Sequence, residues 1–379
     1  MAAAEVVISR PANESTDEER VVSVDTGKPT DIPSYEVVGD WADLSGVAGA
    51  ASCWVHNAIV ATDGAEIIGF HAGQLVAFDP DGRLLRVVET GLTEGHGITL
   101  VREGDHEYLW VSDPGFVFSC GADDGDPNWA PLFGKGVHCE TRAPRVVKMT
   151  LDGQILSELP LPPQDPQIPA GPMGPYCPCG CAVDEERFGG TGDIWVADGY
   201  GSGLVHRFDK DGNHLSTLTG EEGSGRFLCP HAIFVDRRND KVPEVYIADR
   251  INVRVLVYDL DGQYLRTIGE TCLNSPSDFA QWGDLLVVAE IYQRLAVLDS
   301  DDNLVGYIGA DPDPEAAQGW PTRPGWPNDL SDDGRAEIPL LPQHDRFNSP
   351  HAVAADASGN LYVSEWLLGG RYTKLTARR

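Results

Sequence analysis

Two short sequence patterns recur along the chain, and together they constrain the fold more than any other feature. The first is an alternating apolar segment, a turn rich in Asp, Asn and Gly, and a second alternating segment, which is typical of a β-hairpin. Its copies span residues 75–88, 146–159, 204–218, 255–268 and 295–308. The second is a short apolar segment followed by one that usually ends in an acid, with copies at 56–70, 96–113, 179–198, 231–249, 277–290 and 351–365.

The spacing of these patterns predicts an all-β fold. Four strands in every 40 to 50 or so residues are typical of a propeller blade. We therefore expect a poorly ordered leader at 1–31, followed by one six-bladed β-propeller domain of four-stranded antiparallel blades at 32–379. Insertions at about 115–141 and 309–347 are too long for turns and are expected to cover one face.

The last blade lacks a fourth strand of its own, because the chain ends soon after its third. Residues 34–41 resemble the fourth strands of the other blades. We expect this N-terminal strand to close the ring, which would remove the exposed edges that an open sheet must protect.

Charge and hydropathy exclude several partners. Acidic residues outnumber basic ones by 59 to 28, giving a net charge of −31, which repels phosphate backbones and anionic lipids. No run approaches the roughly 18 apolar residues of a membrane helix, and no secretory signal pattern opens the chain. We expect a cytoplasmic protein that acts on a small molecule and has neither nucleic acid nor membrane as a partner. The sequence does not predict its oligomeric state.

Alignment of the six copies places one residue of each at the start of an innermost strand. In a propeller these strands line the central channel, so the six side chains should converge. Four are histidines, and neutral imidazoles that converge on an axis favour a transition-metal site. The six positions are His56, His96, Cys179, His231, Ser277 and His351.

Three histidines with an open position form a catalytic zinc arrangement, so we predict His96, His231 and His351 as ligands. His56 and Cys179 are expected as additional ligands or channel residues. We predict a divalent transition metal, with zinc favoured.

The acids that end the second pattern favour a structural role, in which they accept hydrogen bonds from backbone N–H groups of the next turn. They are Asp113, Asp198, Asp249, Glu290 and Glu365. The residues that follow them differ. Tyr200 and Arg250 should lie at one rim above the metal, as a proton acceptor and an anion clamp. The alternative is a packed aromatic ring and a surface ion pair.

Short motifs surround these residues: Glu94-Gly95-His96-Gly97, Cys229-Pro230-His231, Ser349-Pro350-His351, Asp198-Gly199-Tyr200 and Ala248-Asp249-Arg250. At these motifs the chain resembles NHL-repeat propellers and, within them, the catalytic core of the peptidyl-α-hydroxyglycine α-amidating lyases, over about residues 34–379. The resemblance implies zinc held by the three histidines and Tyr200 acting as a tyrosinate base. It also implies that Arg250 holds a carboxylate or stabilises the departing group, while the carbon–nitrogen bond of a carbinolamide breaks to give an amide and an aldehyde such as glyoxylate.

Two departures from that family redirect the expected substrate. A Phe-His-Arg-Gly segment of the family reads Phe70-His71-Ala72-Gly73 here, and Ala352 replaces an aspartate that binds calcium. We therefore expect no calcium site of the family's kind, and a small α-hydroxylated substrate other than a peptidylglycine.

The function predicted from the sequence is thus a metal-dependent carbon–nitrogen lyase. Alternatives are a hydrolase or hydratase that uses metal-bound water, and a non-catalytic propeller scaffold with a structural metal. Residues expected to line the substrate pocket are His71, Ser277, His138 and Trp326.

Overall fold

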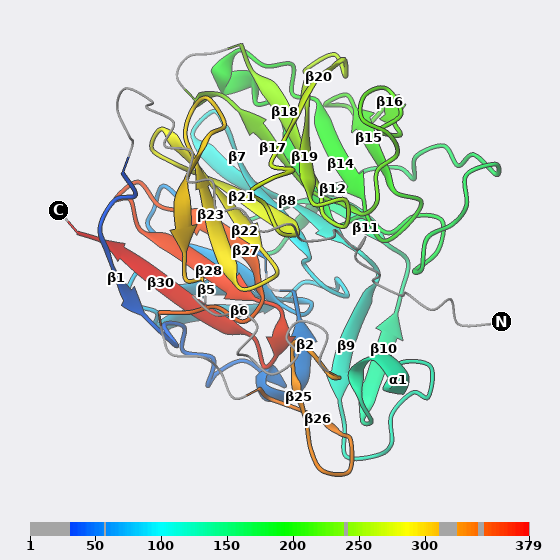
Figure 1. The fold of residues 1–379 in the computed structure, drawn as a ribbon, viewed down its shortest axis with the longest axis vertical. Coiled ribbons are helices and arrows are strands. Elements are labelled where there is room, and N and C mark those ends of the chain that lie inside the picture. Colours follow the sequence, from blue (N-terminus) through cyan, green and yellow to red (C-terminus); the bar gives the residue numbers. More distant parts are fainter. Residues whose placement is uncertain (1–30, 57, 239–241, 311–323, 340–344, 379) are drawn as a thin grey trace, which may run out of the picture.

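The computed structural model describes residues 31–56, 58–238, 242–310, 324–339 and 345–378, and these form an all-β molecule (Figure 1). Six antiparallel sheets of four strands correspond to the predicted blades. The first three blades consist of β3 (Ile59–Ala61), β4 (Ile67–His71), β5 (Gln74–Phe78) and β6 (Leu84–Glu89); β7 (Gly97–Glu103), β8 (His106–Asp113), β11 (Arg145–Thr150) and β12 (Ile155–Glu158); and β13 (Gly180–Val183), β14 (Ile194–Asp198), β15 (Leu204–Phe208) and β16 (His214–Leu218).

The other three blades follow the same order from the innermost strand outwards. They consist of β17 (Pro230–Asp236), β18 (Glu244–Asp249), β19 (Arg254–Asp259) and β20 (Tyr264–Ile268); β21 (Pro276–Trp282), β22 (Leu285–Glu290), β23 (Arg294–Leu298) and β24 (Leu304–Ile308); and β27 (Pro350–Ala355), β28 (Leu361–Glu365), β30 (Arg371–Ala377) and β1 (Tyr35–Val38).

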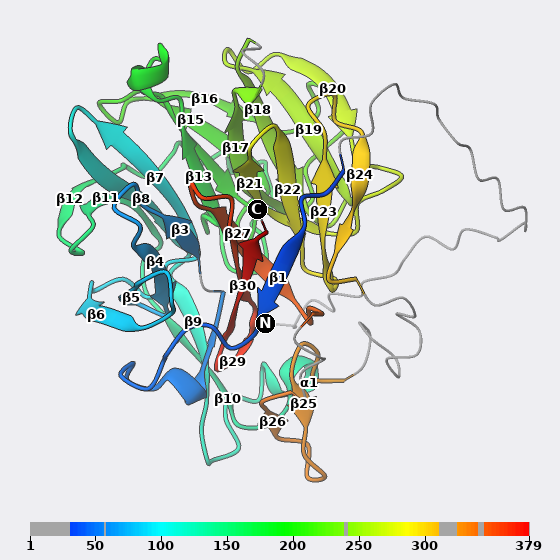
Figure 2. The same ribbon diagram turned by 90° about the vertical axis from the view of Figure 1, so that its left-hand side faces the viewer.

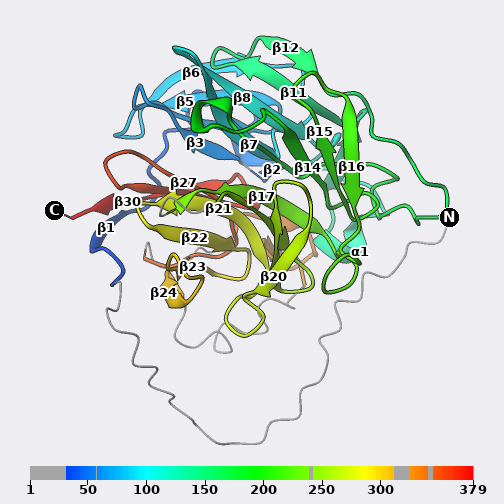
Figure 3. The same ribbon diagram turned by 90° about the horizontal axis from the view of Figure 1, so that it is seen from above.

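The hydrophobic core lies between neighbouring blades rather than within any one of them. Each innermost strand contacts the innermost strand of the next blade, in the order β3, β7, β13, β17, β21, β27, and β27 also contacts β3. Six apolar clusters each combine side chains of two adjacent blades; one of them joins Ile59 and Val76 of the first blade to Tyr362 and Tyr372 of the last. Viewed from above, the sheets surround a common centre (Figure 3).

The outer hairpins follow from one local device. At the turn between β19 and β20, the carboxylate of Asp259 accepts hydrogen bonds from the backbone N–H groups of Asp261 and Gln263, at 2.9 and 2.8 Å. Gly262 follows with a φ of +84°, a conformation that glycine adopts without strain. The same carboxylate hydrogen bonds recur in the outer hairpins at Asp79, Asp209 and Asp299, and in the inner turn between β27 and β28 at Asp356. These five acids therefore contribute to the negative charge of the chain as turn residues.

The N-terminal strand β1 is the outer strand of the last blade. It pairs antiparallel with β30, from Tyr35 opposite Ala377 to Val38 opposite Lys374. The N-terminal strand β1 therefore pairs with the C-terminal strand β30, as predicted. The contribution of this pairing to the closure of the ring stays a prediction, and so does the disordered leader, of which residues 1–30 lie outside the described residues.

The two insertions meet at one face, where they build a sheet that the repeat pattern did not predict. β9 (Phe116–Cys120) and β10 (Val137–Thr141), with α1 (Ala130–Phe133), belong to the first insertion. They join β2 (Cys53–Val55) and β29 (Leu367–Leu368) in a seventh four-stranded sheet. Two short strands of the second insertion, β25 (Asp329–Leu330) and β26 (Ala336–Glu337), contact it through a bridge between Lys135 and Arg335. Figure 2 shows these elements together beside the blades.

Within the described ranges, the remaining short elements include 3-10 helices at Ala50–Ser52 and Glu186–Phe188. Among the described residues, no helix has both the length and the apolar character needed to cross a membrane.

Candidate functional site

Four histidines from four different blades meet at the centre of the propeller. The ring centroid of His96 lies 4.3 Å from that of His56, 4.9 Å from that of His231 and 4.7 Å from that of His351. All four side chains are buried. Burial lowers the pKa of each imidazole well below its ordinary value, which favours the neutral, metal-binding form.

Backbone carbonyls at other ring positions orient two of these histidines. The Nδ1 of His96 donates to the carbonyl of Cys179 at 2.7 Å, and the Nδ1 of His231 donates to the carbonyl of Ser277 at 2.7 Å. Each bond fixes the tautomer, so the lone pair of Nε2 is left to face the axis. The Ser277 side chain hydrogen-bonds backbone carbonyls of its own and the next blade.

Tyr200 lies directly above these two histidines. Its hydroxyl oxygen is 3.1 Å from Nε2 of His96 and 3.2 Å from Nε2 of His231. The guanidinium of Arg250 donates to the same oxygen at 3.2 Å and lies over the ring. Burial raises the pKa of Tyr200 well above its ordinary value, while the charge of Arg250 opposes that shift.

The backbone before Tyr200 comes unusually close to the neighbouring blade. A Cβ on Gly199 would lie 2.3 Å from the carbonyl oxygen of Pro230, so only glycine fits between Asp198 and Tyr200. This approach brings the Tyr200 hydroxyl to the axis. In the next blade Arg250 directly follows Asp249, at the position that corresponds to Gly199.

The recurring acids hold the segments that lead into the innermost strands. Asp198 accepts from the backbone N–H of Cys177 and of Ser202, the second of which is the predicted bond to the next turn. Asp113 accepts from Thr93 and Glu94, just before His96, and Glu365 accepts from Asn348 and Ser349, just before His351. The acids therefore also fix the positions of the ring residues, which was not predicted.

The remaining two histidines have different surroundings. The Nδ1 of His56 lies 2.8 Å from Oε2 of Glu94, a carboxylate that is 1% exposed. The indole of Trp366 stacks on the His56 ring at 5.5 Å. Both ring nitrogens of His351 are buried without a hydrogen-bond partner.

These donors fit a metal ion. The Tyr200 hydroxyl carries one proton and can satisfy only one of the two Nε2 lone pairs beside it, while His351 has nitrogens with no partner at all. A buried imidazole without a partner is costly, and a cation shared among the rings satisfies these lone pairs together. Two overlapping groups have donor atoms within 4.8 Å of one another: His56 with His96 and His351, and Cys179 with His96 and His231.

The residues predicted for the substrate pocket are dispersed. His71 is buried at the end of β4, and its Nε2 donates to the carbonyl of Ala50. His138 is partly exposed on β10 and pairs with Asp123, so it makes no described contact with the four histidines. Trp326 packs against Trp366, one ring removed from His56. His138 is thus a partly exposed residue of the added sheet, whereas Phe116 on the neighbouring strand β9 lies against the rings of His56 and Tyr200.

Two site residues were missed from the sequence. Glu94 stands two positions before His96 in a recognised motif, but only the fold brings it to His56. Trp366 follows the acid of the last blade, in the position that Arg250 holds in the fourth, and this register could have indicated it.

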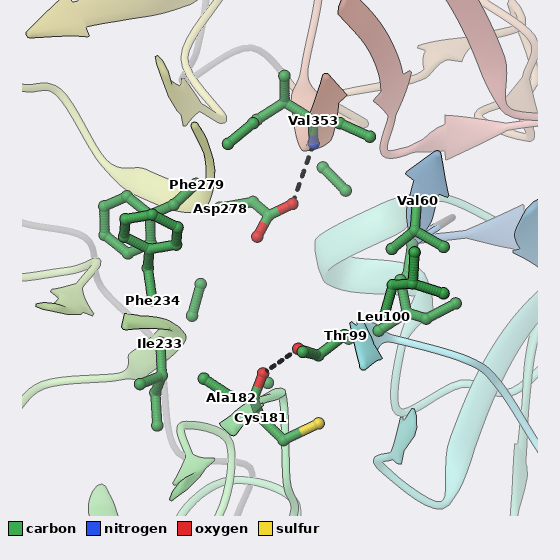
Figure 4. A pocket seen from close by; sticks show the side chains of 18 of the residues that line it. Val60, Thr99, Leu100, Cys181, Ala182, Ile233, Phe234, Asp278, Phe279 and Val353 are labelled. Carbon is green, nitrogen blue, oxygen red and sulfur yellow. Dashed lines mark hydrogen bonds between the residues drawn. The ribbon is translucent and has the colours of Figure 1, made fainter. Parts of the chain in front are cut away.

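A central cavity of about 780 Å³ leads to the histidines along the innermost strands. Its walls include Val60, Leu100 and Ile233, and Figure 4 shows Asp278 pointing between them. The Asp278 carboxylate accepts from the backbone N–H of Val353 at 3.0 Å, so it links the fifth and sixth blades. Tyr200 and Arg250 do not line this cavity.

Sequence comparisons match parts of the chain to known propellers. Residues 190–284 match a family described as a 6-bladed beta-propeller. NHL repeat-containing protein 3 of Homo sapiens is 36% identical over 129 residues, which are 31% of this chain and 35% of that protein. The Mus musculus protein of that name is 35% identical over 118 residues, 28% of this chain and 32% of that one. These findings support an NHL-repeat β-propeller.

The chain spans about a third of each of these relatives. Similar solved structures include a streptogramin B lyase, 12% identical with a TM-score of 0.51, covering 91% of this chain and 98% of that one. A virginiamycin B lyase from Staphylococcus aureus is 13% identical with a TM-score of 0.51, covering 91% and 100%. At these identities the likeness shows the fold alone, and none of these proteins supports the predicted resemblance to amidating lyases.

Proposed function

We propose that this propeller is a metal-dependent lyase that cleaves a small α-hydroxylated, carbinolamide-like substrate. The observation that carries the proposal is the position of the Tyr200 hydroxyl, within hydrogen-bond distance of Nε2 of both His96 and His231 and of Arg250. Residues of three blades thus bring a potential proton acceptor and a fixed positive charge together beside the candidate ligands.

His96, His231 and His351 would hold the metal, with zinc favoured. When bound, the metal would polarise the substrate hydroxyl and lower its pKa. Two of these ligands are pre-oriented by backbone carbonyls, which limits the rearrangement that binding requires.

Tyr200, as the deprotonated tyrosinate, would accept the hydroxyl proton of the substrate. As the carbon–oxygen double bond forms, the bond from that carbon to nitrogen breaks, and the electron pair goes to nitrogen. The nitrogen then takes up a proton from the Tyr200 hydroxyl, which gives an amide and an aldehyde with no net gain or loss of electrons. Arg250 would stabilise the deprotonated Tyr200 or hold a carboxylate of the substrate.

The propeller fold is compatible with lyase chemistry, because two similar structures are named as lyases. Their low identity leaves the argument to the site itself. The partners that we propose are therefore small molecules, in a cytoplasmic setting.

The decisive variant is His231→Ala. We expect it to lose both bound metal, measured by elemental analysis, and aldehyde release from a panel of α-hydroxylated amides. His106→Ala, which changes an exposed histidine on β8, is the matched control and should keep both. Stoichiometric metal and full turnover in His231→Ala would show that the site is assigned wrongly.

Product analysis in heavy-oxygen water separates elimination from hydrolysis or hydration. Direct elimination needs no solvent oxygen in the freshly formed product, whereas attack by metal-bound water incorporates it. Tight metal binding without turnover on a broad panel would instead indicate a scaffold with a structural metal.

A further inference from the structure

We infer that His56 is a fourth metal ligand and that Glu94 is its carboxylate partner, so that the centre is a four-imidazole site without a thiolate. This inference rests on the proposed function, because it concerns the same metal. It adds a ligand and a charged supporting group to the three histidines named above.

The geometry of His56 is that of a prepared ligand. Its ring centroid lies 4.3 Å from that of His96 and 4.8 Å from that of His351, and the three residues bring donor atoms within 4.8 Å of one another. Glu94 accepts from both the backbone N–H and the Nδ1–H of His56, each at 2.8 Å. Two bonds from one carboxylate fix the rotation of the ring and leave Nε2 as its free donor.

Trp366 closes the other face of the imidazole. Its indole lies nearly parallel to the His56 ring, with an interplanar angle of 10°. The indole itself packs against Trp54. The Glu94 carboxylate and the Trp366 indole thereby hold the His56 ring in one orientation, so metal binding would require little movement of this side chain.

Charge gives a second, independent reason. A divalent cation beside Arg250 would bury several positive charges in a site whose four imidazoles are neutral. Among the described residues, Glu94 pairs with His56 and with no lysine or arginine. A buried carboxylate that lacks a basic partner is costly, and a metal held by the same histidine provides the missing positive charge.

Cys179 is the competing fourth ligand, and its surroundings favour a different role. Its sulfur lies 3.7 Å from the carbonyl oxygen of Cys177, to which the thiol donates. Its own carbonyl accepts from His96. Cys179 therefore orients a ligand through its backbone, while its thiol already donates to the carbonyl of Cys177.

A set of four imidazole nitrogens has consequences for the metal. Without a thiolate the site does not select soft ions, and imidazole suits zinc, iron, copper and nickel. With His56, His96, His231 and His351 as donors, a substrate oxygen bound on the side of Tyr200 would be a fifth ligand. This differs from the three-ligand, open tetrahedral centre implied by the histidine motifs alone.

The test compares three variants of the full chain, each loaded with cobalt(II): His56→Gln, Glu94→Gln and, as the matched control, Cys179→Ser. Affinity is measured by competition with a chelator, the number of imidazole ligands by X-ray absorption, and the cobalt coordination by visible absorption. Circular dichroism and the thermal unfolding of the metal-free proteins establish that each variant is folded.

We expect the X-ray absorption of cobalt-loaded His56→Gln to show one imidazole ligand fewer than that of the unchanged protein. The substitution should also weaken cobalt binding at least about 10-fold. Glu94→Gln should keep all four imidazoles but bind cobalt about 10- to 100-fold more weakly, as found for groups that orient metal-binding histidines. Cys179→Ser should bind like the unchanged protein and show the same spectrum.

Four imidazoles and unchanged affinity in His56→Gln would overturn the inference, and so would a loss of affinity confined to Cys179→Ser. If His231→Ala removes the metal while His56→Gln keeps four imidazoles and the affinity of the unchanged protein, the fourth ligand is wrong but the proposed three-histidine function survives. If His231→Ala also retains metal and turnover, the proposed function itself fails.

Discussion

At the scale of single residues, the chemistry depends on a few polar atoms whose hydrogen-bond partners are set by the surrounding packing. The Tyr200 oxygen meets two Nε2 atoms because backbone carbonyls have already taken the Nδ1 protons of His96 and His231. Gly199 allows the close approach that this requires. Proton transfer and metal binding are thereby assigned to different groups, and single substitutions can separate them.

Tyr200→Phe should separate the two functions. The change removes the hydroxyl but not the histidines, so we expect bound metal to remain stoichiometric while turnover falls by about 10²- to 10⁴-fold. Elemental analysis and aldehyde release measure these quantities on the same sample. A Tyr200→Phe protein that turns over at the normal rate would exclude Tyr200 as the proton acceptor.

Asp278 should make stability depend on pH. Burial raises the pKa of its carboxyl to about 7, against an ordinary value of about 4. The folded state therefore binds this proton more tightly than the unfolded chain, and the stabilisation is present below about pH 4 and lost as the pH rises through about 7. We expect Asp278→Asn to flatten the fall in unfolding free energy over that range, measured by urea denaturation.

The control for this effect is Asp261→Asn, which changes an exposed turn aspartate. Its denaturation curves should keep the slope with pH of the unchanged protein. An equal slope in Asp278→Asn would mean that this carboxyl does not retain its proton in the folded state.

At the scale of single elements, four of the five outer hairpins depend on one carboxylate as well as on their strands. Asp259 accepts from two backbone N–H groups of its turn, and Asp79, Asp209 and Asp299 do the same in three other outer hairpins. In the second blade Thr150 takes this place and accepts from the N–H of Gln154 through its hydroxyl. Threonine is therefore a natural substitute.

Asp259→Ala should lower the free energy of unfolding by about 1 to 2 kcal/mol, since it removes the acceptor of both turn hydrogen bonds. Asp259→Thr should recover part of that loss, because a hydroxyl can accept as it does in the second blade. Urea denaturation of the three proteins measures the differences. Equal losses in both variants would show that the turn hydrogen bonds contribute little.

The whole molecule joins its two ends in one blade, where β1 pairs with β30. Tyr35 and Val37 of β1 also pack against the apolar cluster shared by the fifth and sixth blades. Without β1, this cluster would lose part of its cover and β30 would become an exposed edge, which promotes association.

A chain that lacks residues 31–38 along with the leader should melt at least about 5 °C lower than one that lacks residues 1–30 alone, and it should self-associate. Calorimetry and light scattering measure the two effects. Identical melting of the two truncated chains would mean that the N-terminal strand is dispensable for the ring.

The number of blades, the outer hairpins and the set of residues at the axis could be predicted from the sequence. These follow from local rules that repeat: a period of two along each strand, one turn device per hairpin, and one position per innermost strand. Tyr200 and Arg250 could be placed at one rim for the same reason.

Which of these residues contact one another, and what surrounds them, could not be predicted in this way. The bond between His96 and Tyr200 spans 104 residues, the pair of Glu94 and His56 spans 38, and the added sheet combines strands from both ends of the described chain. β2 and β29 are only three and two residues long, too short to leave a periodic signal. Such contacts depend on how the blades pack against one another, which no local pattern encodes.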